Sequence, residues 1–160
     1  MRSHTLCVLA ILIFSLVGCR VSKPVSSTSG VDHTVVEVWA SSDCTQPGDK
    51  IKLRATVTNN GTQTEFVELI DQPVLDIIIR NQGPTVSWSD GKLLTPELTR
   101  FELKPGESKV IEMDWTVKPP AFGSVFYADA SFIYSPRAPG GPAGSSVTIN
   151  VAVCPGPFGP

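Results

Sequence analysis

The feature that most constrains the fold of this chain is an alternation of apolar and polar residues along several short stretches. The alternation is clearest over residues 51–58, 111–117 and 147–153. In each stretch, aliphatic or aromatic side chains occupy every second position. A period of two places alternate side chains on the same face of a β-strand. These stretches therefore predict strands that bury one face.

Turn sequences separate the alternating stretches. They are Gln46–Asp49, Asn59–Gly61, Asn81–Pro84, Ser89–Lys92 and Lys104–Glu107. Asn-Gly and Asp-Gly suit positions with positive φ, and Pro-Gly suits type II turns. Candidate strands lie near residues 34–40, 50–58, 64–70, 74–80, 84–88, 98–103, 108–118, 123–134 and 146–153. Because no stretch after Cys19 has a helical period, the sequence predicts an all-β, immunoglobulin-like antiparallel β-sandwich of about seven to nine strands.

The first twenty residues form a segment of another kind. Arg2 gives a basic start, Leu6–Val17 is an apolar run interrupted only by Ser15, and small Gly18 precedes Cys19. These are the parts of a secretory signal peptide, and the run is shorter than the roughly 20 residues of a membrane-spanning helix. The sequence Leu-Val-Gly-Cys resembles the bacterial lipobox, which implies that Cys19 receives a lipid. An ordinary secreted protein and a retained anchor are the alternatives.

The leader sets the expected organisation of the chain. We expect a signal peptide over residues 1–18, the lipidated cysteine and a flexible, Ser-rich tether over 19–33, a sandwich domain over 34–154 and a Pro/Gly tail over 155–160. The expected location is the bacterial cell envelope, on the extracytoplasmic face of a membrane.

Charge and cysteine usage exclude several classes of function. Removing the leader takes away one of the 13 basic residues and none of the 15 acidic ones, which leaves a formal charge of −3. This balance provides no basic surface for nucleic acid. His33 is the only histidine after the leader, and no cysteine belongs to a close-spaced ligand motif. We therefore expect no metal and no cofactor.

Two cysteines remain once Cys7 leaves with the leader and Cys19 carries lipid. Cys44 and Cys154 are then an isolated pair in an exported protein, which predicts a disulfide. In many immunoglobulin-like sandwiches the first and last strands run parallel, which would bring the two residues together. A bond closing a loop of this size stabilises a fold by up to roughly 4–5 kcal/mol.

An enzyme is the least favoured class. A Ser-His-Asp or Cys-His arrangement needs a histidine on the scaffold, and His33 precedes the first strong strand, where we expect it to be solvated. The carboxylates are scattered, and Glu112 and Asp114 fall on the expected solvent face of one strand. A hydrolase with two carboxylates is the remaining catalytic alternative. The acidic residues in question are Asp71, Asp76, Asp90, Glu97, Glu102, Glu107, Glu112, Asp114 and Asp129.

The middle of the chain carries an ordered set of motifs. They are Val57–Gly61, Glu65–Leu69, Asp76–Ile79, Trp88–Lys92, Leu103–Glu107 and Ile111–Trp115. In order and spacing they resemble the BsuPI domain, the bacterial intracellular proteinase inhibitor family. The chain departs from that pattern at Val86–Ser89, where the family often has Trp-Arg-Trp-Ser, and at Leu94, where it often has an aromatic residue. The resemblance implies an immunoglobulin-like fold and inhibition of a subtilisin-like serine protease.

Two loops are candidate partner-binding surfaces. One consists of Trp88, Ser89, Asp90, Gly91 and Lys92. Trp88 either closes one end of the core or anchors a partner, since Trp is enriched at interface hot spots. The other is Ser135–Ser145, which carries Arg137 and is otherwise a plain connector.

The remaining aromatic residues divide by position. Trp115 alternates in register with apolar neighbours and is expected in the core, whereas Trp39 and Tyr127 could be exposed. The sequence thus predicts a lipid-anchored, non-catalytic protein with a protein-binding sandwich, in its family-derived form a serine protease inhibitor. The alternative is a structural or accessory module of the envelope without inhibitory activity.

Overall fold

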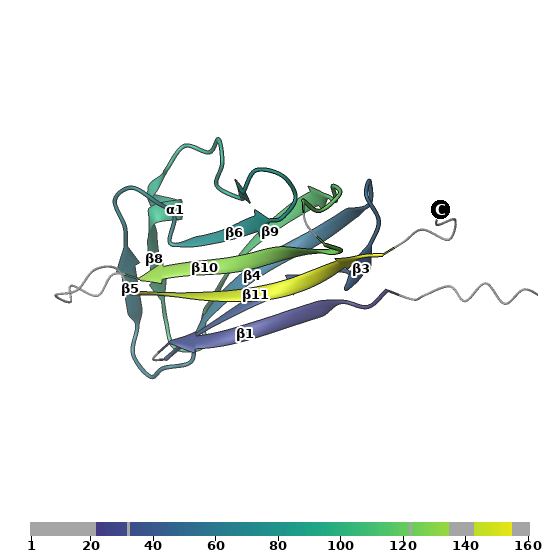
Figure 1. Cartoon of the computed structure of the whole chain (residues 1–160). Helices are drawn as coiled ribbons and strands as arrows, with labels where there is room; N and C mark the ends of the chain where they lie inside the picture. The colour runs from purple at the N-terminus through teal and green to yellow at the C-terminus, as the bar shows by residue number, and fades with distance from the viewer. Residues whose placement is uncertain (1–21, 32, 122, 135–142, 155–160) are drawn as a thin grey trace, which may run out of the picture.

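The chain folds into two β-sheets packed face to face, with a small third sheet at one end (Figure 1). The computed structural model describes residues 22–31, 33–121, 123–134 and 143–154. The first sheet has the order β1 (Val25–Val31), β2 (Thr34–Ala40), β4 (Lys50–Asn59) and β9 (Ser108–Thr116). The second has the order β3 (Cys44–Thr45), β11 (Ala143–Val153), β10 (Val125–Tyr134), β6 (Leu75–Arg80) and β7 (Val86–Ser87). The third pairs β5 (Glu65–Glu68) with β8 (Arg100–Leu103), which follows the short helix α1 (Pro96–Thr99).

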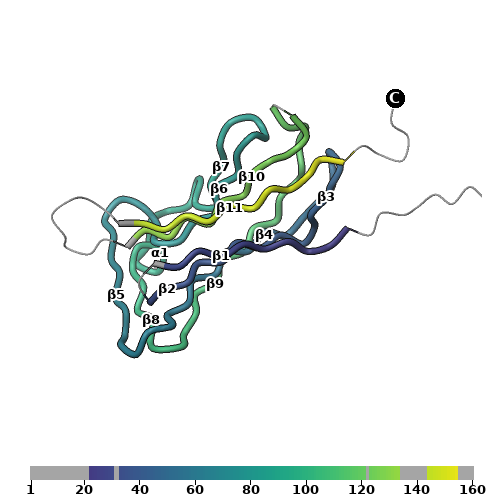
Figure 2. Tube along the Cα trace, turned by 60° about the horizontal axis from the view of Figure 1, so that its bottom comes forward, coloured from purple at the N-terminus to yellow at the C-terminus, as the bar shows by residue number. Residues whose placement is uncertain are grey.

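The core lies between the two large sheets. β1 and β2 lie over β11, and β4 and β9 lie over β6, so the strands of the two layers are roughly aligned, as Figure 2 shows. The alternating residues of β4 supply one wall of the core, with Leu53, Ala55 and Val57 fully buried. Ile77 and Phe126 supply the facing wall. The alternation of apolar and polar residues in the sequence thus corresponds to the burial of one face of each sheet.

Most of the expected strands are present, and the all-β prediction is confirmed. β4, β6, β9 and β10 lie within a residue or two of the expected ranges. Trp115 is buried as expected, whereas Glu112 and Asp114 are exposed on the outer face of β9. Only two residues of the expected strand near 84–88 are extended, because the chain turns immediately after Ser87.

The prediction of a flexible tether over residues 19–33 is wrong for its second half. Residues 25–31 form β1, which pairs with β2 through seven consecutive residue pairs, from Val25–Ala40 to Val31–Thr34. The Ser-rich sequence suggested a linker. An edge strand is held by backbone hydrogen bonds, however, and serine and threonine side chains do not prevent them. The folded part therefore begins before Thr34, and residues 1–21 and 155–160 lie outside the described residues.

The Cys44–Cys154 disulfide is confirmed, with 5.8 Å between the two Cα atoms. The strand that brings the cysteines together is not the expected one. The short β3, rather than β2, pairs in parallel with the end of β11, with Cys44 opposite Ala152. Sequence patterns could not indicate β3, because it is only two residues long. They did not predict α1 either, because four residues are too few to show a helical period.

The two ends of the sandwich are distinct. The disulfide end carries β3, the turn of residues 46–49 and the start of β10, where Val125 pairs with Ala152. The α1 end carries α1, the β5–β8 sheet and the start of β6, where Leu75 pairs with Phe132 (Figure 1). No helix in the described part of the chain is long and apolar enough to cross a bilayer.

Candidate functional site

The loop Trp88–Lys92 has a conformation fixed by its own hydrogen bonds. The Ser87 amide donates to Asp90 Oδ2 at 2.8 Å, and the Asp90 amide donates back to the Ser87 carbonyl at 3.1 Å. A second turn comes next, in which the Lys92 amide donates to the Ser89 carbonyl at 3.0 Å. Gly91 lies at φ 73°, a conformation that glycine adopts without strain. The loop thus keeps its shape without a partner.

A buried carboxylate beneath the loop fastens it to β6. Asp76 Oδ2 accepts from the Ser89 hydroxyl at 2.6 Å, and Asp76 Oδ1 accepts from the Ser89 amide at 3.2 Å and the Ile77 amide at 2.9 Å. Burial raises the pKa of Asp76, and the hydrogen bonds from Ser89 and Ile77 oppose that rise. The sequence alone left Asp76 as one of several scattered acids, because its partner Ser89 lies 13 residues away.

Trp88 and Lys92 contact each other across the loop. The Lys92 ammonium lies 3.0 Å from the centroid of the Trp88 ring, a cation–π contact. Partial loss of solvent around the ammonium lowers the pKa of Lys92, and the charge of Asp76 opposes this. Trp88 packs against the core and, with Leu98, Phe101 and Val110, lines a cavity of about 290 Å³. Of the two interpretations of Trp88, the structure therefore supports closure of the core.

The solvent-exposed part of the loop begins at Asp90. Asp90, Gly91 and Lys92 are exposed, and so are Leu93 at 83% and Leu94 at 42%. Within the described residues, the exposed large apolar side chains are Phe66, Ile70, Leu93, Leu94 and Val110. They come from β5, the segment after it, the segment before α1, and β9 beside the cavity. All four of these segments belong to the α1 half of the sandwich, and exposed large apolar side chains are one mark of a protein-binding surface.

Two motifs of the family pattern, Val57–Gly61 and Leu103–Glu107, meet at the α1 end and hold the β5–β8 sheet in place. Asn59 is fully buried, and its side chain donates to the carbonyls of Leu103 at 2.9 Å and Gln63 at 2.7 Å. The main-chain carbonyl of Asn59 accepts from the Gly106 amide at 2.8 Å. Gly61 is required here because a Cβ would lie 2.8 Å from His33 Cβ. These motifs therefore build the fold of the α1 end.

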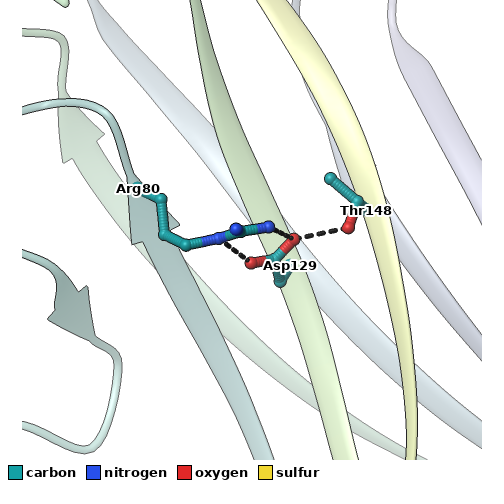
Figure 3. Close-up of polar contacts among 3 residues, drawn as sticks. All are labelled: Arg80, Asp129 and Thr148. Atoms are coloured by element: carbon teal, nitrogen blue, oxygen red, sulfur yellow. Dashed lines mark hydrogen bonds and ion pairs between the residues drawn. The ribbon is translucent and has the colours of Figure 1, made fainter. Parts of the chain in front are cut away.

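A polar cluster on the outer face of the second sheet is the other notable group (Figure 3). Arg80 Nε donates to Asp129 Oδ2 at 2.6 Å, and Arg80 Nη2 donates to Asp129 Oδ1 at 3.0 Å. The Thr148 hydroxyl also donates to Oδ1, at 2.6 Å. Arg80 lies 5.6 Å from the ring of Tyr127. Both carboxylate oxygens are engaged, so the cluster ties β6, β10 and β11 together.

The other expected residues have simpler outcomes. His33 is exposed, and no set of three or more His, Cys, Asp or Glu in the described ranges could hold a metal ion. Trp39 is half-buried, with the guanidinium of Arg54 at 4.7 Å from its ring. Cys19 and Arg137 lie outside the described residues, and the end of the second candidate loop, from Ala143 onward, belongs to β11.

Two solved structures that resemble this chain do so weakly. A Paenibacillus sp. cycloisomaltooligosaccharide glucanotransferase complexed with cycloisomaltoheptaose is 17% identical, with a TM-score of 0.42 over 79% of this chain and 14% of that chain. A β-glucosidase from Erythrobacter marinus is 12% identical, with a TM-score of 0.35 over 78% of this chain and 15% of that chain. The chain thus spans a small fraction of either enzyme, and neither likeness carries an argument.

Comparison with protein families is decisive. No curated protein matches the sequence significantly. The family model described as BsuPI, intracellular proteinase inhibitor, matches residues 38–135. The match spans more than half of the chain and includes the Asn59 and Gly106 turns, Asp76 and the Trp88–Lys92 loop. The chain therefore belongs to the BsuPI family of intracellular proteinase inhibitors.

Proposed function

We propose that this chain is a non-catalytic, lipid-anchored envelope protein that binds and inhibits a subtilisin-like serine proteinase. The observation that carries the proposal is the family match over residues 38–135. The contact surface is the exposed part of the Trp88–Lys92 loop together with Leu93 and Leu94.

The loop has the properties that such a contact requires. An inhibitor must offer the proteinase an accessible segment whose conformation does not relax after binding. The hydrogen bonds from Ser89 to Asp76 and between Ser87 and Asp90 order the loop in advance, which reduces the entropy lost on association. Leu93 provides an exposed apolar side chain next to this rigid segment, suited to an apolar pocket on the enzyme.

The leader supports an extracytoplasmic target. An apolar run followed by Leu-Val-Gly-Cys at residues 16–19 is the pattern of a lipoprotein precursor. An inhibitor held at the envelope through Cys19 meets proteinases of that compartment, whereas the family name refers to intracellular enzymes. The proposed partner is therefore a secreted or envelope serine proteinase.

Titration against several secreted and envelope serine proteinases tests the proposal. The chain should inhibit at least one of them in a dose-dependent way, and a Lys92→Ala/Leu93→Ser variant should lose most of that inhibition. Lys118→Ala is the matched control, because Lys118 also lies over a tryptophan ring, at 5.1 Å from Trp115, but belongs to the disulfide end.

The alternative function gives a different result in the same experiment. An accessory module of the envelope would inhibit none of the enzymes, or would be cleaved slowly as an ordinary substrate. Either result would contradict the inhibitor proposal and leave only the family fold established.

A further inference from the structure

We infer that the sandwich stands on the membrane with its disulfide end toward the lipid headgroups and its α1 end pointing away. This inference rests on the proposed anchoring at Cys19 and adds an orientation to it. It replaces a long flexible tether with a short stem that joins the anchor to one corner of the domain.

The stem enters the fold almost immediately after the proposed anchor. The Lys23 amide donates to Asp43 Oδ1 at 3.0 Å, and the Asp43 amide donates to the Lys23 carbonyl at 2.7 Å. Two residues later, β1 begins its seven-residue pairing with β2. The four residue steps from Cys19 to Lys23 span at most about 14 Å. A chain of that length cannot carry the domain far from the bilayer.

The disulfide fastens the same corner to both sheets. Asp43 directly precedes Cys44, and the Asp43 carbonyl accepts from the Ala152 amide at 3.0 Å. Through Lys23 the corner is joined to β1 of the first sheet, and through the Cys44–Cys154 bond it is joined to β11 of the second. The point where the anchor attaches is therefore the covalently reinforced point of the domain.

The length of the domain then separates its two ends. β11 has eleven residues, which is about 36 Å at 3.3 Å per residue. The stem is much shorter than this strand, so the molecule cannot invert and place the α1 end against the membrane. Phe66, Ile70 and Leu93 are consequently carried on the end that faces away from the membrane.

The surface of the disulfide end is compatible with this placement. Its exposed residues include Pro47, Gly48, Asp49, Lys50 and Lys118. None of the large apolar side chains exposed in the described residues lies there. A polar surface of this kind can contact the headgroups but does not insert into the bilayer, so the acyl chains alone attach the protein to the membrane.

Fluorescence quenching from the membrane surface tests the orientation. The full chain, processed in a bacterial host, is reconstituted in phosphatidylcholine vesicles that carry a headgroup-attached quencher. One sample has a genetically encoded fluorophore at Asp49, at the disulfide end, and the other has it at Lys104, in an exposed turn of the α1 end. We expect the fluorophore at Asp49 to lose most of its emission and the fluorophore at Lys104 to lose little.

A second variant links the result to the stem. A Gly/Ser insertion of about fifteen residues between Cys19 and Lys23 adds a reach of roughly 20 Å and should make quenching at the two positions similar. Equal quenching in the unmodified chain, with Cys19 shown by mass spectrometry to be acylated, would overturn the orientation and leave the inhibitor proposal untouched. An unmodified Cys19 would overturn the anchoring itself and the orientation with it.

Discussion

The two ends of the sandwich are stabilised by different means. At the disulfide end, a covalent bond joins β3 to β11 and the exposed residues are polar or small. At the α1 end, buried polar side chains such as Asn59 and Asp76 hold loops in place, and large apolar side chains are exposed at the same end. A covalently closed end is suited to carrying an anchor. An end with ordered loops and exposed apolar groups is suited to binding a protein.

Removal of the disulfide should have the largest effect on stability. A Cys44→Ser/Cys154→Ser variant should lose about 2–5 kcal/mol, because the unfolded chain is no longer constrained. Chemical denaturation under non-oxidising conditions measures the loss. Because the bond lies at the end away from the loop, proteinase inhibition by the folded variant should be unchanged. A simultaneous loss of inhibition would show that the two ends are not independent.

Removal of the Asn59 side chain should be the next largest perturbation, and it acts on the α1 end. Asn59→Ala should cost about 2–3 kcal/mol, because the carbonyls of Leu103 and Gln63 lose their donor and remain partly buried. Asn60→Ala is the control, since Asn60 is exposed and should change stability by less than about 0.5 kcal/mol. Equal effects of the two substitutions would contradict the role of Asn59.

The ionisation of Asp76 should give a smaller effect that depends on pH. Because burial raises its pKa above the ordinary value of 3.8, the folded chain binds this proton more tightly than the unfolded chain. The contribution of Asp76 to stability is therefore greatest at low pH and falls as pH rises through the folded pKa. Carboxyl NMR should find a titration above 3.8, and Asp76→Asn should remove this part of the pH dependence. A titration below 3.8 would show that the hydrogen bonds from Ser89 and Ile77 outweigh burial.

Substitution of the exposed leucines should have the smallest effect on stability. Leu93→Ser/Leu94→Ser should change the free energy of unfolding by less than about 0.5 kcal/mol, since exposed side chains contribute little to folding. The same variant should bind a target proteinase more weakly, which titration would detect. A large loss of stability would show that the leucines belong to the fold rather than to a binding surface.

The sequence predicted the parts of the fold that depend on residue pattern. Leu53, Ala55 and Val57 alternate with polar neighbours, and β4 buries them as that pattern indicates. β1 was missed because its Ser/Thr-rich sequence has no apolar alternation and its strand is held by backbone pairing with β2. The disulfide was predictable by elimination among cysteines, whereas the strand that brings them together was too short to leave a pattern.

The candidate site was only partly predictable for a related reason. The Ser89–Lys92 turn was visible as Ser-Asp-Gly-Lys, and its internal hydrogen bonds are local. The bond from Ser89 to Asp76 depends on how β6 and β7 pair, which no local pattern specifies. The exposure of Leu93 likewise depends on the three-dimensional fold and not on its neighbours in sequence.

Photo-crosslinking in intact cells can establish whether the α1 end binds a proteinase while the disulfide end faces the membrane. A photoreactive amino acid replaces Leu93 in one strain and Lys50 in another, and adducts are identified by mass spectrometry. We predict an adduct with a serine proteinase from position 93 and none from position 50. A proteinase adduct from position 50 with none from position 93 would contradict both the proposed contact surface and the proposed orientation.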